Sequence, residues 1–172
     1  TVVSFPTSED TCYLFYLENS REPLRVPEDQ ANAMIRERLA EYTAPAVLEA
    51  LEQVTDARQV IFRPLDITLV PAPWYRGRVV LIGDAAHAPT PHMTSGGGMA
   101  IEDAVVLADC VSKTRSVKEA LAMYSERRFE RCQTICDASL QLCRYEQEDP
   151  LKNREKSAAL LLKTYQYLSQ PI

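Results

Sequence analysis

One carboxylate and one run of glycines stand close together in the middle of the sequence. Asp84 and Gly83 follow the apolar run Val79–Ile82, and the consecutive glycines Gly96–Gly98 precede a pattern typical of a helix. A carboxylate accepts hydrogen bonds, and a helix that starts on glycines offers unpaired backbone N–H groups and the positive end of its dipole. These residue types predict an electron-rich ligand held between one carboxylate and one cluster of N–H groups.

The elements that must position these groups are a strand, a loop and a helix. The run Val79–Ile82 is β-branched and leucine-rich, which predicts a buried strand covered on both faces. Gly83 ends this strand and lets the backbone turn closely. Asp84 then lies at the carboxyl end of the strand, where open α/β sheets bind their ligands. Residues 99–110 continue as a helix.

Two histidines, His87 and His92, also belong to this loop and are the only ones in the chain. A metal site needs three or four ligands at suitable spacing, and the sequence offers no third ligand here. No Ser/His/Asp or Cys/His pairing suggests a nucleophile either. We therefore predict no metal site and expect His87 to be a hydrogen-bonded structural residue.

The same stretch resembles the second FAD-binding motif of single-component flavoprotein monooxygenases, the aromatic hydroxylases of the p-hydroxybenzoate and salicylate hydroxylase type. The resemblance rests on the run from Gly83 to His87, on Pro91 and Gly96, and on Ala100–Ala104. It implies that Asp84 hydrogen-bonds the ribityl chain of FAD. It also implies that the helix start directs N–H groups at the N1/C2 carbonyl edge of the isoalloxazine, where the reduced flavin is negatively charged. The cofactor-binding residues implied are Gly83, Asp84, Pro91, Gly96, Gly97, Gly98 and Met99, with His92 as a substrate-side candidate.

The chain departs from many family members after Pro91. Met93-Thr94-Ser95 stands where Gly-Gly-Gln is common, and Gly98 stands where an Asn is common. These departures place the chain closer to the salicylate-hydroxylase-like branch.

The resemblance implies an α/β (mixed α+β) fold that is the C-terminal portion of a p-hydroxybenzoate-hydroxylase-like protein. Residues 1–75 would form part of the substrate-binding sheet with two helices. Residues 76–112 would be the last strand, loop and helix of the FAD-binding domain, and residues 113–172 would be helices packed on that domain. No Gly-x-Gly-x-x-Gly motif is present, so the N-terminal FAD-binding portion is an expected missing partner.

The implied activity is that of an FAD-dependent monooxygenase, which hydroxylates a phenolic or other small aromatic molecule with NAD(P)H and O2. Two other classes stay open. The chain is alternatively a non-catalytic remnant or interaction module on the same scaffold that binds no flavin alone. A third reading keeps the flavin but changes the chemistry to that of an oxidase or halogenase.

The remaining elements are predicted from pattern. We expect a hairpin from strands 1–5 and 11–17 whose second strand lies inside a larger sheet, because both its faces are apolar. A turn at 21–26, helices at about 27–42 and 46–54, and an extended segment at 60–70 follow. Trp74 is expected to pack against the motif loop. A long helix runs from a capping box at Ser116 to about residue 146, and a final helix spans 151–168.

Composition excludes several classes of partner. The net charge is −5, and no Lys/Arg cluster suits a nucleic acid or an anionic membrane. No apolar stretch reaches the roughly 20 residues of a membrane helix, so we expect a cytoplasmic protein, with a homo-oligomer left open. The charges of Glu126–Arg131 alternate, which predicts a solvated face. Cys132, Cys136 and Cys143 share a helix face, and we favour a core role over a metal or redox cluster.

Overall fold

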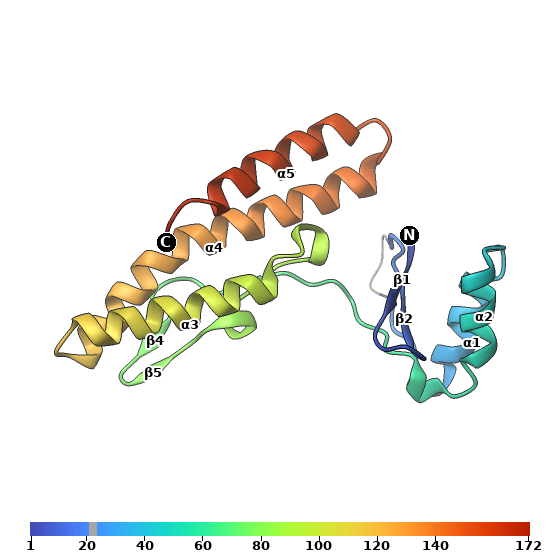
Figure 1. The fold of residues 1–172 in the computed structure, drawn as a ribbon, viewed down its shortest axis with the longest axis horizontal. Helices are drawn as coiled ribbons and strands as arrows, with labels where there is room; N and C mark the ends of the chain where they lie inside the picture. Colours follow the sequence, from blue (N-terminus) through green and yellow to red (C-terminus); the bar gives the residue numbers. More distant parts are fainter. Residues whose placement is uncertain (21–23) are drawn as a thin grey trace. The chain divides into compact units, whose positions relative to one another are not determined.

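The chain forms two compact units, residues 1–64 and residues 65–172, in a computed structural model that describes residues 1–20 and 24–172 (Figure 1). The expected mixture of helices and strands is confirmed. The turn predicted at 21–26 falls partly outside the described residues. No described helix is both long enough and apolar enough to span a membrane.

The first unit is a hairpin with two helices. Strand β1 (Val2–Pro6) pairs antiparallel with β2 (Cys12–Tyr16), with Ser4 opposite Leu14. Its helices are α1 (Ala31–Arg38) and α2 (Pro45–Gln53), and short 3-10 turns η1 (Glu28–Gln30) and η2 (Ala57–Gln59) flank them. Proline at the first position of α2 fits there because that N–H has no partner within a helix. The small core consists of Leu39, Val47 and Leu51, with Val2, Leu14, Tyr16 and Ile35 packed against it.

The prediction that the second hairpin strand lies inside a larger sheet was wrong for the part of the chain described. Among the described residues, β2 pairs only with β1. Leu14 and Tyr16 face the small core, whereas Tyr13 on the other face is 52% exposed. The sequence shows that both faces are apolar, but among the described residues of this unit no further strand pairs with β2 and the second face is not covered.

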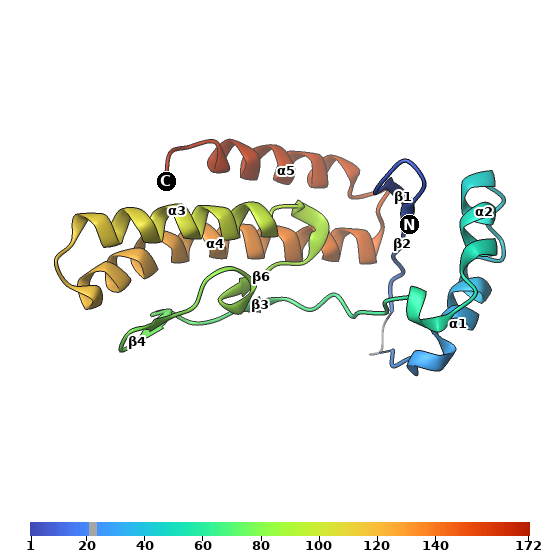
Figure 2. The ribbon, with the colours of Figure 1, turned by 60° about the horizontal axis from the view of Figure 1, so that its bottom comes forward.

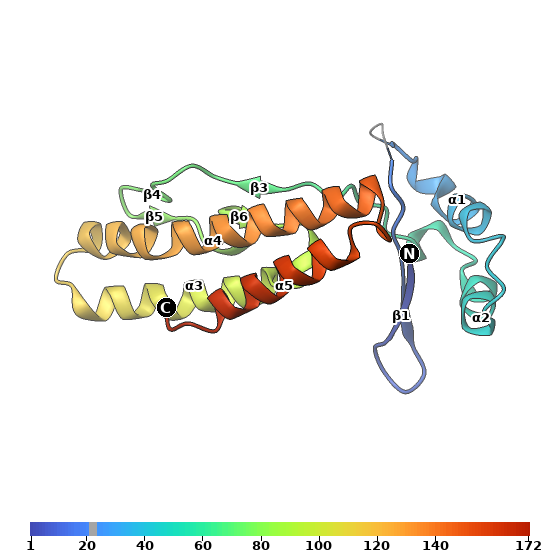
Figure 3. The same ribbon diagram turned by 90° about the horizontal axis from the view of Figure 1, so that it is seen from above.

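The second unit is built on three helices, α3 (Gly96–Lys113), α4 (Val117–Glu148) and α5 (Arg154–Leu168). Helices α3 and α4 run side by side (Figure 3), and together they lie between α5 and the short strands (Figure 2). Ser116 precedes α4 as expected, but its side chain makes no capping hydrogen bond, so the capping box was wrong. Asp149 ends α4, and its carboxylate accepts from the N–H groups of Leu151 and Lys152 in the turn before α5.

Short strands cover one face of α4. Strand β3 (Thr68–Leu69) pairs with β6 (His87–Ala88), and β4 (Tyr75–Arg76) pairs with β5 (Val79–Val80). The prediction of a strand buried on both faces at 79–82 was wrong within this chain. Only Val79 and Val80 belong to the strand pair, with one further bond from the Leu81 N–H to the carbonyl of Trp74. Val79 is 69% exposed and Ile82 is 42% exposed. No residue of the second unit covers the outer face of this segment, although its composition suits a buried strand.

The core of the second unit surrounds Trp74, which is fully buried. Its ring lies 5.3 Å from that of His87 and 5.7 Å from that of Phe129, and its indole N–H donates to the carbonyl of Val70 at 2.7 Å. Trp74 therefore packs against the motif loop as predicted. Cys132 and Cys136 are buried in α4, as expected for core residues.

Candidate functional site

The turn that carries Asp84 depends on the glycine before it. Residues Gly83–Ala85 form the 3-10 turn η3, and Gly83 has φ +56°, a left-handed conformation that favours glycine. A Cβ at Gly83 would lie 3.2 Å from the Cβ of Ala100, so the turn packs tightly against α3. Asp84 itself is exposed, and its carboxylate has no hydrogen bond or ion pair to any residue that the structure describes. The turn therefore presents a free acceptor beside the first turns of α3.

The start of α3 presents free donors. The first N–H group of α3 that makes a hydrogen bond is that of Met99, which donates to the carbonyl of Ser95 at 2.9 Å. The hydroxyl of Ser95 bonds the Met93 carbonyl instead of capping the helix. The N–H groups of Gly96–Gly98 thus have no acceptor among the described residues. A Cβ at Gly97 or Gly98 would meet nothing within 4 Å, so a ligand can approach this backbone closely.

The loop between these two features is held by α4 and α5. Pro91 begins the 3-10 turn η4 (Pro91–Met93), and the carbonyl of Met93 accepts a hydrogen bond from the Tyr165 hydroxyl at 3.0 Å. His92 is largely buried, with Nδ1 3.0 Å from Thr90 Oγ1 and Nε2 3.3 Å from a carboxylate oxygen of Glu146. Both ring nitrogens of this substrate-side candidate are therefore within reach of polar groups of the chain.

Asp103 bonds both ends of the segment that carries Asp84, and sequence reasoning missed it. Its Oδ2 accepts from the Gly83 N–H at 2.8 Å and from His87 Nε2 at 2.7 Å, and its Oδ1 accepts from Arg128 Nε at 2.7 Å. His87 is thus the hydrogen-bonded structural residue that was predicted. Burial alone would raise the pKa of Asp103, but the bonds from His87, Gly83 and Arg128 outweigh burial, so the pKa lies below its ordinary value.

The arginines of α4 correct the prediction of a solvated face at 126–131. Arg128 is fully buried and Arg131 is nearly so. Arg128 Nη1 donates to Glu102 at 2.6 Å, and Arg131 donates to both oxygens of Glu102 at 2.7 and 2.9 Å and to the carbonyl of Leu168 at 2.7 Å. The local alternation of charges hid this, because the partner acids lie on another helix. The sequence did indicate a buried carboxylate, because Asp103 shares a helical face with Met99, Val106 and Cys110, and all four residues are buried.

The fold also brings a cluster of possible metal ligands together. One ligand atom from each of His87, Asp103 and Cys132 lies within 4.8 Å of the others, although the sequence spacing suggested no third ligand beside the histidines. The guanidinium of Arg128 already lies among them, 2.7 Å from Asp103 and 3.5 Å from Cys132 Sγ. Burial also raises the pKa of Cys132 to about 12, which keeps the thiol protonated. The cation that Asp103 binds here is therefore a guanidinium.

Comparison with known proteins shows the family to which the chain belongs. The sequence pattern of the family described as "FAD binding domain" matches residues 2–139, so the chain belongs to that family. The chain is 31% identical to the putative FAD-dependent monooxygenase YetM of Bacillus subtilis over 139 residues, which are 81% of this chain and 37% of that protein. It is 37% identical to 6-hydroxynicotinate 3-monooxygenase of Pseudomonas fluorescens over 95 residues, which are 54% of this chain and 23% of that protein.

Solved structures show the same likeness. A variant of HpxO from Klebsiella pneumoniae, solved with FAD, superposes with a TM-score of 0.75 at 26% identity over 97% of this chain and 44% of that one. HpxO with FAD and uric acid gives a TM-score of 0.64 at 26% identity over 85% of this chain and 37% of that one. The chain thus spans less than half the length of the relatives it matches.

The residues present fit the part of FAD that such a portion would contact. An exposed carboxylate without a partner suits hydroxyl groups, and a helix start with three free N–H groups suits an electron-rich ring edge. The open space at Gly97 and Gly98 admits a flat ligand against the backbone.

Proposed function

We propose that this chain is the C-terminal portion of an FAD-dependent monooxygenase and supplies one half of its flavin site. The observation that carries the proposal is the pairing of a free carboxylate with free N–H groups. Asp84 follows Gly83, and Gly83 packs on Ala100 of α3. The first N–H groups of the same helix, at Gly96–Gly98, have no acceptor in the described chain.

Each group has a distinct role in this proposal. Asp84 accepts hydrogen bonds from the ribityl hydroxyls and so fixes the position of the flavin. The N–H groups of Gly96–Gly98 and the helix dipole stabilise negative charge on the flavin ring edge. Pro91 shapes the loop between them, while Gly83 and Met99 act through the backbone geometry of the turn and of the helix. Bound FAD would supply the redox chemistry, accepting electrons from NAD(P)H and activating O2.

The substrate in this proposal is a small aromatic molecule. Support comes from the names of similar proteins, which act on 6-hydroxynicotinate or were solved with uric acid or 2-aminobenzoylacetate. His92 lies in the loop beside the glycine-rich helix start, which is why it is the substrate-side candidate. The use of NAD(P)H rests on the family resemblance.

An uncovered apolar surface supports the idea that an N-terminal portion completes the protein. Ile101 and Val105 on α3 are 69% and 62% exposed, and Val79 is 69% exposed on β5. Exposed apolar side chains one turn apart on a helix, as at Ile101 and Val105, suit a surface that another segment covers. Residues 1–75 would then extend a substrate-binding sheet, residues 76–112 would complete an FAD-binding domain, and residues 113–172 would pack outside it. The comparisons do not favour the alternative of a non-catalytic module.

The test is FAD retention by the complete protein after Asp84→Ala, with Asp66→Ala as the matched control. Both aspartates are exposed, and neither carboxylate has a partner among the described residues. Hydrogen bonds to a charged acceptor are worth about 1.5–3 kcal/mol, so we expect FAD affinity to fall roughly 10- to 100-fold for Asp84→Ala. The control should retain FAD, and both variants should keep the wild-type melting temperature without FAD. Unchanged FAD affinity after Asp84→Ala would contradict the assignment.

A further inference from the structure

Asp103 binds both ends of the segment that carries Asp84. The segment runs from Gly83 to His87, and one oxygen of Asp103, Oδ2, accepts from the first residue's N–H and from the last residue's ring. Gly83, His87 and Asp103 are all buried, whereas Asp84 between the two held ends is exposed. The carboxylate thus fixes the shape of the turn without contacting the ligand-facing side chain.

We propose that Asp103, held by Arg128, is a positioning residue of the flavin site that fixes the direction in which Asp84 is presented. The proposal rests on the proposed function, because it assumes that Asp84 contacts the flavin. It differs from that function in assigning a role to residues that face away from the ligand.

Only an ionised carboxylate satisfies all the donors that meet at this point. Three N–H donors converge on Asp103, from Gly83, His87 and Arg128. A carboxylate accepts on both oxygens, whereas an asparagine amide accepts on one oxygen and turns an NH2 group toward the other donors. Asp103→Asn therefore leaves at least one buried donor facing another donor. If the NH2 group faces Gly83, the left-handed turn loses the bond that fixes its N–H; if it faces Arg128, the turn loses its link to the guanidinium.

Arg128 connects the same carboxylate to the free helix start. Its Nη2 donates to the carbonyl of Met99 at 3.2 Å while its Nε binds Asp103. Met99 directly follows the glycines whose N–H groups are free, and Asp103 lies one turn further along α3. The turn that carries Asp84 and the start of α3 are thereby anchored to one guanidinium. The acceptor and the donors of the site keep a fixed geometry relative to each other.

The chain supplies its own matched control. Asp109, two turns further along α3, pairs with Arg127 of α4 at 2.7 Å and with Lys113 at 2.8 Å. This pair also joins α3 to α4, but its side chains are about 30% exposed and it contacts nothing in the turn at Gly83. Asp109→Asn removes an ion pair between the same two helices without touching the proposed positioning bonds.

The experiment compares Asp103→Asn, Asp109→Asn and Asp84→Ala in the complete protein with two readouts. The first is the FAD dissociation constant, and the second is the hydrogen-exchange rate of the Gly83 amide in protein freed of FAD. We expect Asp103→Asn to weaken FAD binding by at least about tenfold, the loss of roughly one hydrogen bond to a charged group. It should also speed Gly83 exchange. Asp109→Asn should change neither readout.

The outcomes separate the positioning role from a general loss of stability and from the proposed function. Asp84→Ala should weaken FAD binding without changing Gly83 exchange. If Asp103→Asn lowers the melting temperature but binds FAD like the wild type below it, Asp103 is structural only and the inference is wrong. If Asp84→Ala leaves FAD binding unchanged, the proposed function fails, and Gly83 exchange alone then decides whether Asp103 holds the turn. If Asp103→Asn does not fold, Arg128→Lys gives a second test. It keeps a buried positive charge, so we expect a smaller effect on both readouts.

Discussion

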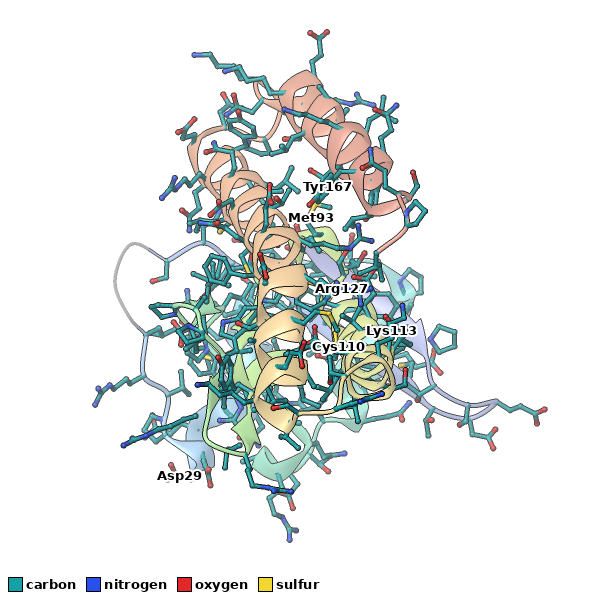
Figure 4. All side chains as sticks on the ribbon, turned by 90° about the vertical axis from the view of Figure 1, so that its left-hand side faces the viewer. Asp29, Met93, Cys110, Lys113, Arg127 and Tyr167 are labelled. Carbon is teal, nitrogen blue, oxygen red and sulfur yellow. The ribbon has the colours of Figure 1, made fainter. Side chains whose placement is uncertain are left out.

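Among the ion pairs that join α3 to α4, two Asp–Arg pairs of the same chemistry lie in different environments. Asp103 and Arg128 meet with both side chains fully buried, next to the turn that carries Asp84. Asp109 and Arg127 meet nearer the far end of the helix with side chains about 30% exposed, and Figure 4 shows Arg127 and Lys113 gathered there beside Cys110. The buried pair has five further partners in Gly83, His87, Glu102, Met99 and Cys132, whereas the more exposed pair is bonded mainly to Lys113.

The two pairs differ in how completely their charges are buried and hydrogen-bonded. Burying a charge is costly unless it is paired and hydrogen-bonded, and the charges of this network meet that condition even though the neighbouring Nδ1 of His87 is buried without a partner among the described residues. Asp103 meets that condition with three donors. The network lies beside the candidate site, where a fixed backbone matters. Water and salt ions compete with the more exposed pair, so it contributes little to stability.

The largest expected effect comes from removing the buried cation. Arg128→Met leaves the carboxylate of Asp103 buried without its charged partner, which typically costs about 3–5 kcal/mol of unfolding free energy. Arg127→Met, the control, leaves Asp109 exposed and paired with Lys113, so a much smaller change is expected. Urea unfolding of both variants checks this, and equal destabilisation would remove the distinction between the two pairs.

The second largest expected effect is the pH dependence of the stability that the buried pair contributes. The pKa of Asp103 lies below its ordinary value, so its contribution to stability is full above the unfolded-state pKa, about 3.9, and is lost as the pH falls through the lower folded-state pKa. The destabilisation caused by Asp103→Asn should therefore be constant from pH 7 to about pH 5. Below about pH 4 it should shrink, because the wild type loses the same charge. Unfolding free energies measured between pH 7 and 3 decide this, and a difference that grows with acid would show the reverse sign.

Salt should affect the exposed pair and spare the buried one. At 1 M salt the screening length falls to about 3 Å, which weakens exposed ion pairs but not buried ones. The small shift in melting temperature caused by Asp109→Asn should disappear in 1 M NaCl, whereas the shift caused by Arg128→Met should persist. Thermal unfolding of the two variants in low and high salt is the measurement. A salt-sensitive effect at Arg128 would mean that water reaches the buried network.

The smallest effect concerns the thiols beside the two arginines. Arg128 Nη2 lies 3.5 Å from Cys132 Sγ, and Arg127 Nη1 lies 3.6 Å from Cys110 Sγ. Burial raises the pKa of Cys132 to about 12, so we expect it to resist a thiol reagent at pH 8 in the folded protein, while the exposed Cys12 reacts. Mass spectrometry of labelled peptides checks this. Rapid labelling of Cys132 in the native wild type would contradict its burial.

Sequence alone predicted the local features of the site well. The glycine before Asp84, the free helix start at Gly96–Gly98 and the contact of Trp74 with the motif loop depend on neighbours within the motif or on residue type, so the pattern reveals them. Family membership, carried by the same motif, was predicted too. The long helix after Ser116 was also found, because its apolar periodicity is strong.

What the sequence did not reveal depends on contacts between distant elements. The charges at 126–131 alternate like those of a solvated face, yet Arg128 and Arg131 bind Glu102 and Asp103 on another helix. Local pattern cannot show which face of α4 meets α3. The run Val79–Ile82 was expected to be covered on both faces, but Val79 and Ile82 are exposed in the second unit.

The most direct test of the flavin site is hydrogen exchange of the complete protein with and without FAD. The N–H groups of Gly96–Gly98 have no acceptor in the described chain and should exchange quickly without FAD. FAD should slow exchange at these glycines and around Asp84, while the turn at Gly77 in the β4–β5 hairpin should be unchanged. If FAD binds and slows exchange elsewhere but not at Gly96–Gly98, the flavin does not lie against this helix start and the assignment is wrong.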